Sequence, residues 1–207
     1  MPTGAFSPVR YGDTPVKISL LFPPTWHPSQ PYLSIPSLTG FLAQAGIKNV
    51  SQKDLGIELL DALVTKSYGI EVYSKLTDLQ KQLERNRTGE TGHGSEEHYT
   101  RVVESLERFS YLIDDIEPAK ASLRSEEFYD QERYRECLFL IDKWLEVVSS
   151  LYFPTRMTVV DNQFTNYSLY SSKDLMKVIR DDTQNPYIDL LKQLCLPAIL
   201  SEQPDLI

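Results

Sequence analysis

The sequence lacks long apolar runs, a secretory type of leader and a large number of cysteines. No run of about 18 apolar residues occurs, which excludes a membrane-spanning helix. The first 13 residues lack the basic and then apolar order of a secretory signal, so we expect the cytoplasm as the compartment. Two cysteines, Cys137 and Cys195, are too few for a disulfide framework or a structural zinc site. Their apolar helical surroundings predict buried, unreactive thiols.

Basic clusters are also missing. The chain has 21 basic and 29 acidic residues, and its net charge is −8. Proteins that bind DNA or RNA present a basic face that displaces counterions from phosphate groups. Arg85 and Arg87 are isolated among polar residues. We therefore expect no nucleic-acid partner.

The familiar catalytic arrangements are missing as well. The sequence contains no Ser-His-Asp set, no GxSxG elbow, no GxxxxGK phosphate loop and no GxGxxG. His93 and His98 flank Glu96 and Glu97, but their spacing does not match a helical HExxH metal motif. A solvated loop is the simpler interpretation of that segment. We expect neither a catalytic residue nor a metal site in this chain.

The first residues predict the start of a parallel sheet. Residues 1–14 are rich in proline, glycine and small polar residues, and we expect a flexible lead-in. Residues 16–22 form a short apolar run of strand formers that ends at Pro23 and Pro24. An apolar run bounded by turn residues is typical of a strand buried in a parallel sheet.

A helix and a second strand are predicted to follow. Ser34 is the expected helix cap, and Gly46 is the expected stop. Residues 50–55 then resemble a shorter strand. The order of strand, loop, helix and strand over residues 15–56 is the first βαβ portion of a doubly wound sheet.

The middle of the chain, residues 57–153, is predicted to be a helical insert. Apolar residues recur at helical spacing in three stretches, residues 57–85, 96–116 and 126–152. Residues 86–95 form a polar, glycine-rich break, and Pro118 is expected to interrupt the second helix.

The return segment, residues 154–207, has mixed character. Residues 158–160 could be extended, and a short helix is expected to begin near Ser171. Another helix is expected to start at Asn185 and Pro186, and Pro197 is expected to kink or end it. The final PDLI has the pattern of the start of a buried strand. Domains rarely stop there, because the backbone groups of such a strand would lack partners. We therefore expect a truncated piece of a longer protein.

Together these patterns predict an α/β fold. It would be a partial doubly wound parallel sheet, Rossmann-like or flavodoxin-like, with a large and mostly helical insert.

Two blocks on either side of the helical middle follow a known pattern. The first is FPPTWHPSQPYLSIPSLTGFLAQAG with VSQKDLGIELLD, and the second is YSLYSSKDLMKVIRDDTQNPYIDLLKQLCLPAILSEQPDLI. They resemble the N-terminal cobalamin-binding region of cobalamin-dependent radical-SAM proteins. In that family a strand ends in Pro-Pro, a proline-containing loop leads into a helix ending in Gly, and YSS-DL, NP and PDL precede the next strand.

The resemblance implies a module that supplies part of a cobalamin cleft and does not catalyse a reaction alone. The parent would be an enzyme of the methyltransferase or cyclase type. The Cys-x-x-x-Cys-x-x-Cys signature is absent here, so the 4Fe-4S cluster and S-adenosylmethionine would belong to a downstream radical-SAM domain of the same polypeptide. The Asp-x-His-x-x-Gly loop that ligates cobalt in one branch of cobalamin proteins is not matched, since Thr25 and Gln30 stand in place of Asp and Gly.

By the same resemblance, six residues are candidates for contact with the cofactor: Pro24, Thr25, Trp26, His27, Tyr32 and Asp54. His27 follows the first strand, where ligands bind in open α/β sheets, but a simply exposed histidine is the alternative. Trp26 and Tyr32 either line a pocket or pack the loop onto the sheet. Asp54 either accepts a hydrogen bond from the cofactor or caps the next helix.

A helical protein-interaction module, with the α/β portion only as its support, is the alternative function. We expect weak cobalamin affinity in this chain alone, because a doubly wound domain has about five strands and the sequence predicts fewer. An open sheet edge also offers a route to a homodimer.

Overall fold

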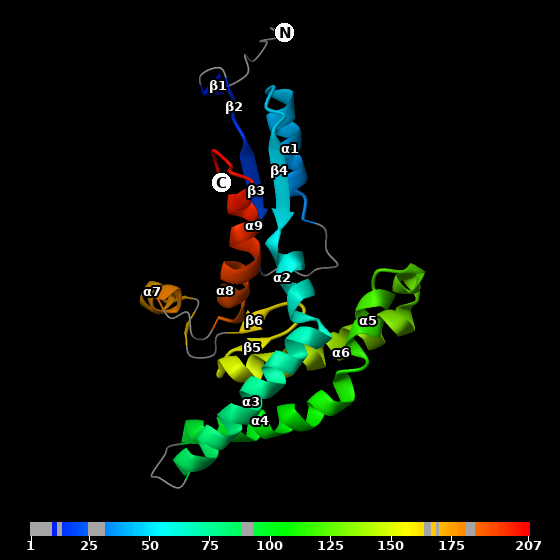
Figure 1. The fold of residues 1–207 in the computed structure, drawn as a ribbon, viewed down its shortest axis with the longest axis vertical. Coiled ribbons are helices and arrows are strands. Elements are labelled where there is room, and N and C mark those ends of the chain that lie inside the picture. Colours follow the sequence, from blue (N-terminus) through cyan, green and yellow to red (C-terminus); the bar gives the residue numbers. More distant parts are fainter. Residues whose placement is uncertain are drawn as a thin grey trace. The chain divides into compact units, whose positions relative to one another are not determined.

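The chain divides into two compact units. The computed structural model describes residues 10–11, 14–24, 32–87, 93–163, 167–168, 170–180 and 185–207. Unit 1 contains Met1–Leu59 and Asp189–Ile207, and unit 2 contains Leu60–Ile188 (Figure 1). In the part of the chain that the structure describes, no helix is long and apolar enough to cross a membrane.

Unit 1 contains the parallel strands that the sequence predicts. Strands β3 (Ile18–Phe22) and β4 (Val50–Asp54) pair in parallel, from Ile18 opposite Val50 to Phe22 opposite Asp54. Leu206 forms a parallel bridge with Ile18 on the other edge of β3, and Ser19 N–H donates to the Leu206 carbonyl at 2.9 Å. Leu206 therefore lies beside β3 through a single bridge, but its side chain is 57% exposed, so the buried strand that the PDLI pattern predicts is not observed within the described residues.

A short hairpin precedes the parallel pair. Strands β1 (Arg10–Tyr11) and β2 (Thr14–Pro15) are antiparallel, within residues predicted to be a loose lead-in.

Helix α1 (Ser34–Gln44) connects β3 to β4 and ends where the sequence predicts. Gly46 has a φ of 85°, which favours glycine, and its N–H donates to the Ala43 carbonyl at 3.1 Å. Ile47 N–H donates to the Leu42 carbonyl at 2.9 Å, which completes a Schellman motif. The prediction that Ser34 caps this helix is wrong. Leu33 occupies the cap position, and its side chain makes no capping hydrogen bond.

The two faces of the sheet contact different helices. Side chains alternate along a strand, so Phe22 and Lys53 point to opposite faces. The Phe22 ring contacts Tyr32, just before α1, at 4.2 Å between centroids. On the other face, Lys53 forms an ion pair of 3.0 Å with Glu202, just after helix α9 (Leu196–Ser201). Helices thus cover both faces of the sheet.

The last helix passes through Pro197 without ending. Helix α8 (Pro186–Leu190) begins as predicted, with Asn185 Oδ1 accepting from Tyr187 N–H at 3.0 Å. A π-helical segment, Leu191–Cys195, then joins it to α9. A proline has no N–H for the usual helical bond, and a wider π turn is one way in which a helix accommodates that loss. The chain therefore stays helical across Pro197, and the π turn just before it is the kind of irregularity at which a helix kinks.

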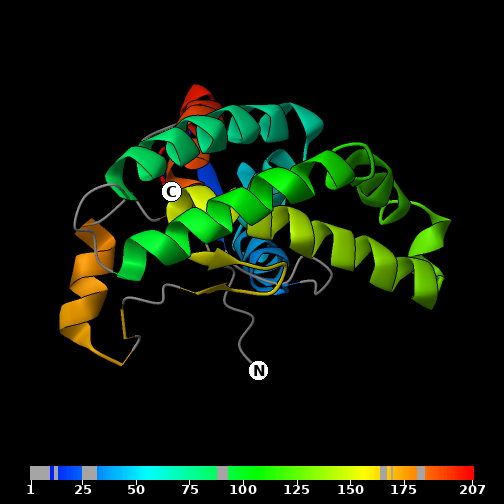
Figure 2. The ribbon, with the colours of Figure 1, turned by 90° about the horizontal axis from the view of Figure 1, so that it is seen from below.

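Unit 2 is mainly a layer of helices. Its elements after helix α2 (Leu55–Leu63) are α3 (Lys66–Arg87), α4 (His93–Leu112), α5 (Ile116–Ser122), the 3₁₀ turn Glu126–Tyr129, α6 (Gln131–Ser149), the 3₁₀ turn Ser150–Tyr152, β5 (Arg156–Met157), β6 (Asn162–Gln163) and α7 (Ser172–Arg180). Helices α3, α4 and α6 lie alongside one another (Figure 2). The predicted helical middle is thus observed, with more breaks than the periodicity indicates.

The first of these breaks separates α2 from α3, where one helix was predicted. All four carbonyl groups at the end of α2, from Leu60 to Leu63, have partners. In chain order, the donors are Val64 N–H, Lys120 Nζ, Thr65 Oγ1 and Trp144 Nε1. Lys120 and Trp144 come from distant parts of the sequence, so the end of α2 depends on the tertiary fold. The local spacing of apolar residues therefore could not predict it.

Three further predictions in unit 2 are wrong. Pro118 lies in the first turn of α5 and does not interrupt a helix, because the N–H groups of a first turn need no helical partner. His98 lies on α4 and not in a solvated loop. Thr158 accepts the N–H groups of Val160 and Asp161, so these residues form the turn between β5 and β6 and not an extended segment.

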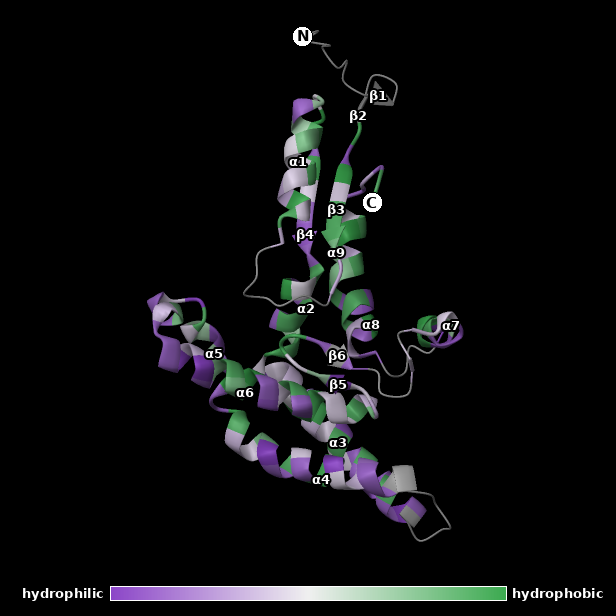
Figure 3. Ribbon diagram, turned by 180° about the vertical axis from the view of Figure 1, so that it is seen from behind, coloured by the Kyte–Doolittle hydropathy of each residue, from purple (hydrophilic) through white to green (hydrophobic). Residues whose placement is uncertain are grey.

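Trp144 is the centre of the core of unit 2. Its side chain is 1% exposed, its indole N–H donates to the Leu63 carbonyl at 2.8 Å, and its ring lies 5.9 Å from that of Phe109. A Cβ at Gly69 would lie only 2.1 Å from Trp144 Cη2, so α3 needs glycine for this close approach. Hydrophilic residues occupy much of the outer surface of α4 and α6 (Figure 3).

We predict that Gly69→Ala destabilises unit 2 by about 1 to 3 kcal/mol, because the new methyl group overpacks the Trp144 site. This loss should outweigh the gain of about 1 kcal/mol in helix propensity. Urea unfolding followed by tryptophan fluorescence measures the change. Gly40→Ala on α1 is the control, since nothing lies within 4 Å of its added Cβ. Unfolding followed by circular dichroism should show that Gly40→Ala leaves the stability of the protein unchanged or raises it. Equal stability of Gly69→Ala and the wild type would contradict the proposed close packing.

Candidate functional site

The carboxyl ends of β3 and β4 bring two predicted site residues together. Pro24 follows β3, and Asp54 is the last residue of β4. A Cβ at Gly56 would lie 3.2 Å from Asp54 Oδ1 and 3.8 Å from Pro24 Cα. Gly56 therefore permits the segment after β3 to approach the start of α2, at the edge where parallel sheets bind ligands.

Asp54 has a structural role at this edge. Its Oδ1 accepts a hydrogen bond from Ile57 N–H at 3.1 Å, in the first turn of α2. This is the helix-cap alternative that the sequence left open. Within the described residues, Oδ2 of the same carboxylate has no hydrogen bond, so it can still accept one from a ligand.

Tyr32 also lies near this edge. Its ring packs against Phe22, the last residue of β3, while its side chain stays 42% exposed. The ring therefore packs against the sheet, as one of the two alternatives for Tyr32 predicts. Thr25, Trp26 and His27 lie outside the described residues.

The described residues at this edge offer apolar area and one hydrogen-bond acceptor. Pro24 and Tyr32 offer apolar area, and Asp54 Oδ2 offers an acceptor for an amide N–H. Among the described residues, no group of three or more His, Cys, Asp or Glu side chains is placed to hold a metal ion.

The two cysteines are buried and free, as predicted. Burial raises the pKa of the Cys195 thiol, and the negative charge of Glu58 adds to the effect while Lys53 opposes it. A thiol with a raised pKa stays protonated and is a poor nucleophile. Cys195 is therefore a packing residue of unit 1.

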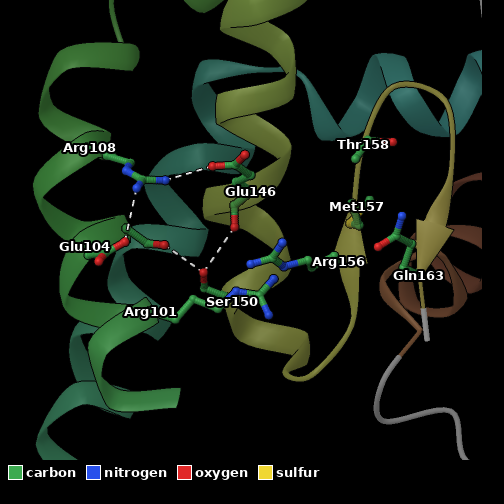
Figure 4. A pocket seen from close by; sticks show the side chains of 10 residues that line it. Arg101, Glu104, Arg108, Glu146, Ser150, Arg156, Met157, Thr158 and Gln163 are labelled. Atoms are coloured by element: carbon green, nitrogen blue, oxygen red, sulfur yellow. Dashed lines mark hydrogen bonds and ion pairs between the residues drawn. The ribbon is translucent and has the colours of Figure 1, made fainter. Parts of the chain in front are cut away.

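Unit 2 contains a second concave site, which the sequence analysis missed. A cavity of about 280 Å³ lies between α4, the end of α6 and the β5–β6 hairpin (Figure 4). Its lining residues are Arg101, Glu104, Ser105, Arg108, Glu146, Ser150, Arg156, Met157, Thr158 and Gln163. The spacing of Arg101, Ser105 and Arg108 along one helical face was the available signal. Arg156 comes from a separate element, so sequence spacing could not reveal the whole cavity.

The two glutamates that line this cavity are paired with basic side chains. Arg108 donates to Glu146 at 2.8 Å and to Glu104 at 3.1 Å. Lys143 also pairs with Glu146, at 2.8 Å. Both glutamates therefore have cationic partners.

Arg101 is held differently from Arg108. Its Nη2 donates to Ser149 Oγ at 3.0 Å and to the Thr155 carbonyl at 2.9 Å. Burial lowers the pKa of the Arg101 guanidinium, and the charge of Arg156 lowers it further. Arg156 thus lies close enough to repel Arg101, while the charges of Glu97 and Glu146 partly oppose the fall in the pKa of Arg101.

His98 lies on the same helix as Arg101 and stacks on Phe153, with ring centroids 4.5 Å apart. Its Nε2 is 3.1 Å from the Ser150 carbonyl oxygen, so Nε2 carries a proton and donates it. Burial lowers the pKa of His98, and the bond to Ser150 only partly opposes that effect. The folded protein therefore favours the neutral ring.

We predict that the stability of unit 2 falls as pH drops below 6.5, the ordinary pKa of histidine. The unfolded chain takes up a proton at His98 in that range before the folded chain does, so protonation favours unfolding until the pH is below the folded pKa. Urea unfolding from about pH 8 to about pH 5 measures this slope. His98→Gln should flatten it. An unchanged slope in this variant would show that other groups cause the pH dependence.

We also predict that Asp54→Ala destabilises unit 1 by about 1 kcal/mol, because α2 loses its capping acceptor. Asp54→Asn should have nearly wild-type stability, since the amide oxygen can accept the same Ile57 N–H. Urea unfolding followed by circular dichroism compares the two variants. Equal losses in both would indicate that the negative charge, and not the cap, is what stabilises the helix.

Comparison with known proteins assigns no family. The chain matches no family model, no curated protein and no solved structure. Its function must therefore be argued from its residues and their geometry.

Proposed function

We propose that this chain is a cobalamin-binding-like module of a radical-SAM enzyme. It would supply part of the cofactor cleft without catalysing a reaction alone. The observation that supports this function best is the order of the sheet, in which β3 lies between β4 and Leu206 with all pairings parallel. This order, two paired strands and one bridge, is consistent with the first three strand positions of a doubly wound, flavodoxin-like sheet.

In such sheets the ligand binds outside the carboxyl ends of two neighbouring strands whose connections run to opposite faces. Helix α1 follows β3 on one face, and α9 precedes Leu206 on the other. The crevice would then lie beyond β3, beside the segment that begins at Pro23 and Pro24. That segment leads into Thr25, Trp26 and His27, the centre of the sequence resemblance.

Each candidate residue has a proposed part in this cleft. Pro24, Trp26 and Tyr32 would contact the flat ring system, and Asp54 Oδ2 would accept a hydrogen bond from a peripheral amide group. Thr25 and His27 would line the loop, with no cobalt bond assigned to either. When bound, cobalamin would carry a methyl group or assist radical chemistry in the parent enzyme.

A downstream radical-SAM domain would complete the enzyme. That domain would hold the 4Fe-4S cluster and S-adenosylmethionine, for which this chain has no three-cysteine signature. Apolar side chains on α1 and α9 are consistent with further covering elements, because Phe41 is 68% exposed and Leu200 is 61% exposed. Exposed apolar residues on both helices suit a sheet that continues beyond three positions.

A helical protein-interaction module is the second candidate function. It is favoured by the independent core of unit 2, where Trp144, Val102 and Leu145 are all nearly inaccessible to solvent. A unit with its own core can present a surface without help from the sheet. In this case the α/β portion would act only as a support.

We predict that the chain binds hydroxocobalamin with a dissociation constant on the order of 0.1 mM, since one side of a cleft gives few contacts. Equilibrium dialysis followed by cobalamin absorbance measures the binding. Asp54→Asn keeps the helix cap but replaces Oδ2 by an amide nitrogen, so it should weaken binding up to about tenfold. Asp78→Asn removes a carboxylate from α3 in unit 2 and should leave binding unchanged.

Two outcomes would contradict this proposal. Tight, stoichiometric uptake would mean that the chain forms a complete cleft. No retention of cobalamin by the folded wild-type chain at millimolar concentration would reject the cofactor and leave the helical interaction module as the better function.

A further inference from the structure

We propose that the cavity of unit 2 binds an oxyanion, either a phosphate or a carboxylate group carried by a small ligand. Arg101 and Arg156 would bind the anion between them. This inference concerns residues of unit 2 alone and does not depend on the cobalamin proposal.

The first argument is that Arg101 is fixed in place with donors to spare. Its two hydrogen bonds, to Ser149 Oγ and the Thr155 carbonyl, both come from Nη2. A guanidinium has five N–H donors. Within the described residues, the Nε and Nη1 donors of Arg101 make no hydrogen bond. The group is therefore oriented by the protein while part of it can still bind a ligand, a form of preorganisation that reduces the entropy lost on binding.

The second argument is that Arg156 has no acidic partner. Its backbone pairs with Gln163 in the β5–β6 hairpin. Its side chain makes no hydrogen bond or ion pair with any other residue that the structure describes. Figure 4 shows the guanidinium groups of Arg101 and Arg156 ending in the same part of the cavity, with Gln163 next to Arg156. An anion between the two arginines would replace their repulsion with two attractions.

The acidic residues of the cavity do not supply that anion. Glu104 and Glu146 both bind Arg108, and Glu146 also binds Lys143. The hydrogen bonds drawn in Figure 4 keep these groups on the side of the cavity formed by α4 and α6. The charges of Glu97 and Glu146 also act on Arg101, but among the described residues neither forms an ion pair with Arg101 or Arg156.

The size of the cavity limits the ligand. Its volume of about 280 Å³ lies near the lower end of the range of about 300 to 1,000 Å³ for small-molecule sites. Arginine pairs suit phosphate and carboxylate groups, because the guanidinium donors match two oxygens at once. The expected ligand is therefore a small metabolite with one such group, and the Gln163 side chain adds a polar contact near it.

The test uses the full chain with inorganic phosphate and with succinate, each compared with chloride at equal ionic strength. Equal ionic strength separates specific binding from general screening of charges. We expect at least one of the two anions to raise the midpoint of thermal unfolding with a saturating dependence on concentration. Isothermal titration then gives its dissociation constant. The anion that binds more tightly identifies the preferred group.

Two variants locate the site. Arg156→Gln removes a side chain that has no hydrogen-bond or ion-pair partner among the described residues, so it should fold normally and weaken anion binding by about tenfold. Arg135→Gln is the matched control, because Arg135 is exposed on α6 and does not line the cavity. It should bind the anion as the wild type does. Arg101→Lys keeps the positive charge but removes the bidentate guanidinium donor, so it should also weaken anion binding.

Three results would overturn the proposal. The first is that neither anion stabilises the chain beyond the effect of chloride. The second is that Arg156→Gln, folded as judged by circular dichroism, binds the anion as tightly as the wild type. The third is that Arg135→Gln weakens binding as much as Arg156→Gln does, since this would indicate a general effect of net charge.

Discussion

The pairing of β3 on both of its edges determines how unit 1 is built. A parallel strand needs a partner on each side, because its buried N–H and C=O groups lose their bonds to water. β4 supplies one side after a short helical connection. The other side comes from residues 205 and 206, which bond to Lys17 and Ser19 across 188 positions of sequence. The sheet therefore requires the chain to return after the whole of unit 2.

Such a long excursion is acceptable because the cost of closing a loop grows only slowly with its length. It also requires that the inserted part stabilise itself. Unit 2 satisfies this condition with a core around Trp144, to which α2, α3, α4 and α6 contribute. The indole joins this core to the end of α2 through one buried hydrogen bond. Packing and the end of a helix thus depend on the same side chain.

Local rules explain which parts of the fold could be predicted from the sequence. β3 and β4 are short apolar or mixed runs bounded by turn residues, and Gly46 ends α1 through its own backbone. Asn185 starts α8 for a similarly local reason. The break between α2 and α3 had no local signal, because Lys120 and Trp144 supply two of the bonds that end α2. Pro118 was misjudged because its position in the first turn of a helix, and not its presence, decides its effect.

The same contrast between local and distant contacts explains which candidate site could be predicted from the sequence. Asp54 was found because it stands between a strand and a helix, and capping is a local interaction. The arginine pair was missed because Arg101 and Arg156 meet only after α4 and the β5–β6 hairpin have folded together. The composition makes this pair notable. In a chain with 29 acidic and 21 basic residues, most cations can find an acidic neighbour at little cost. Among the described residues no carboxylate pairs with either Arg101 or Arg156, so a bound anion would offset the repulsion between them.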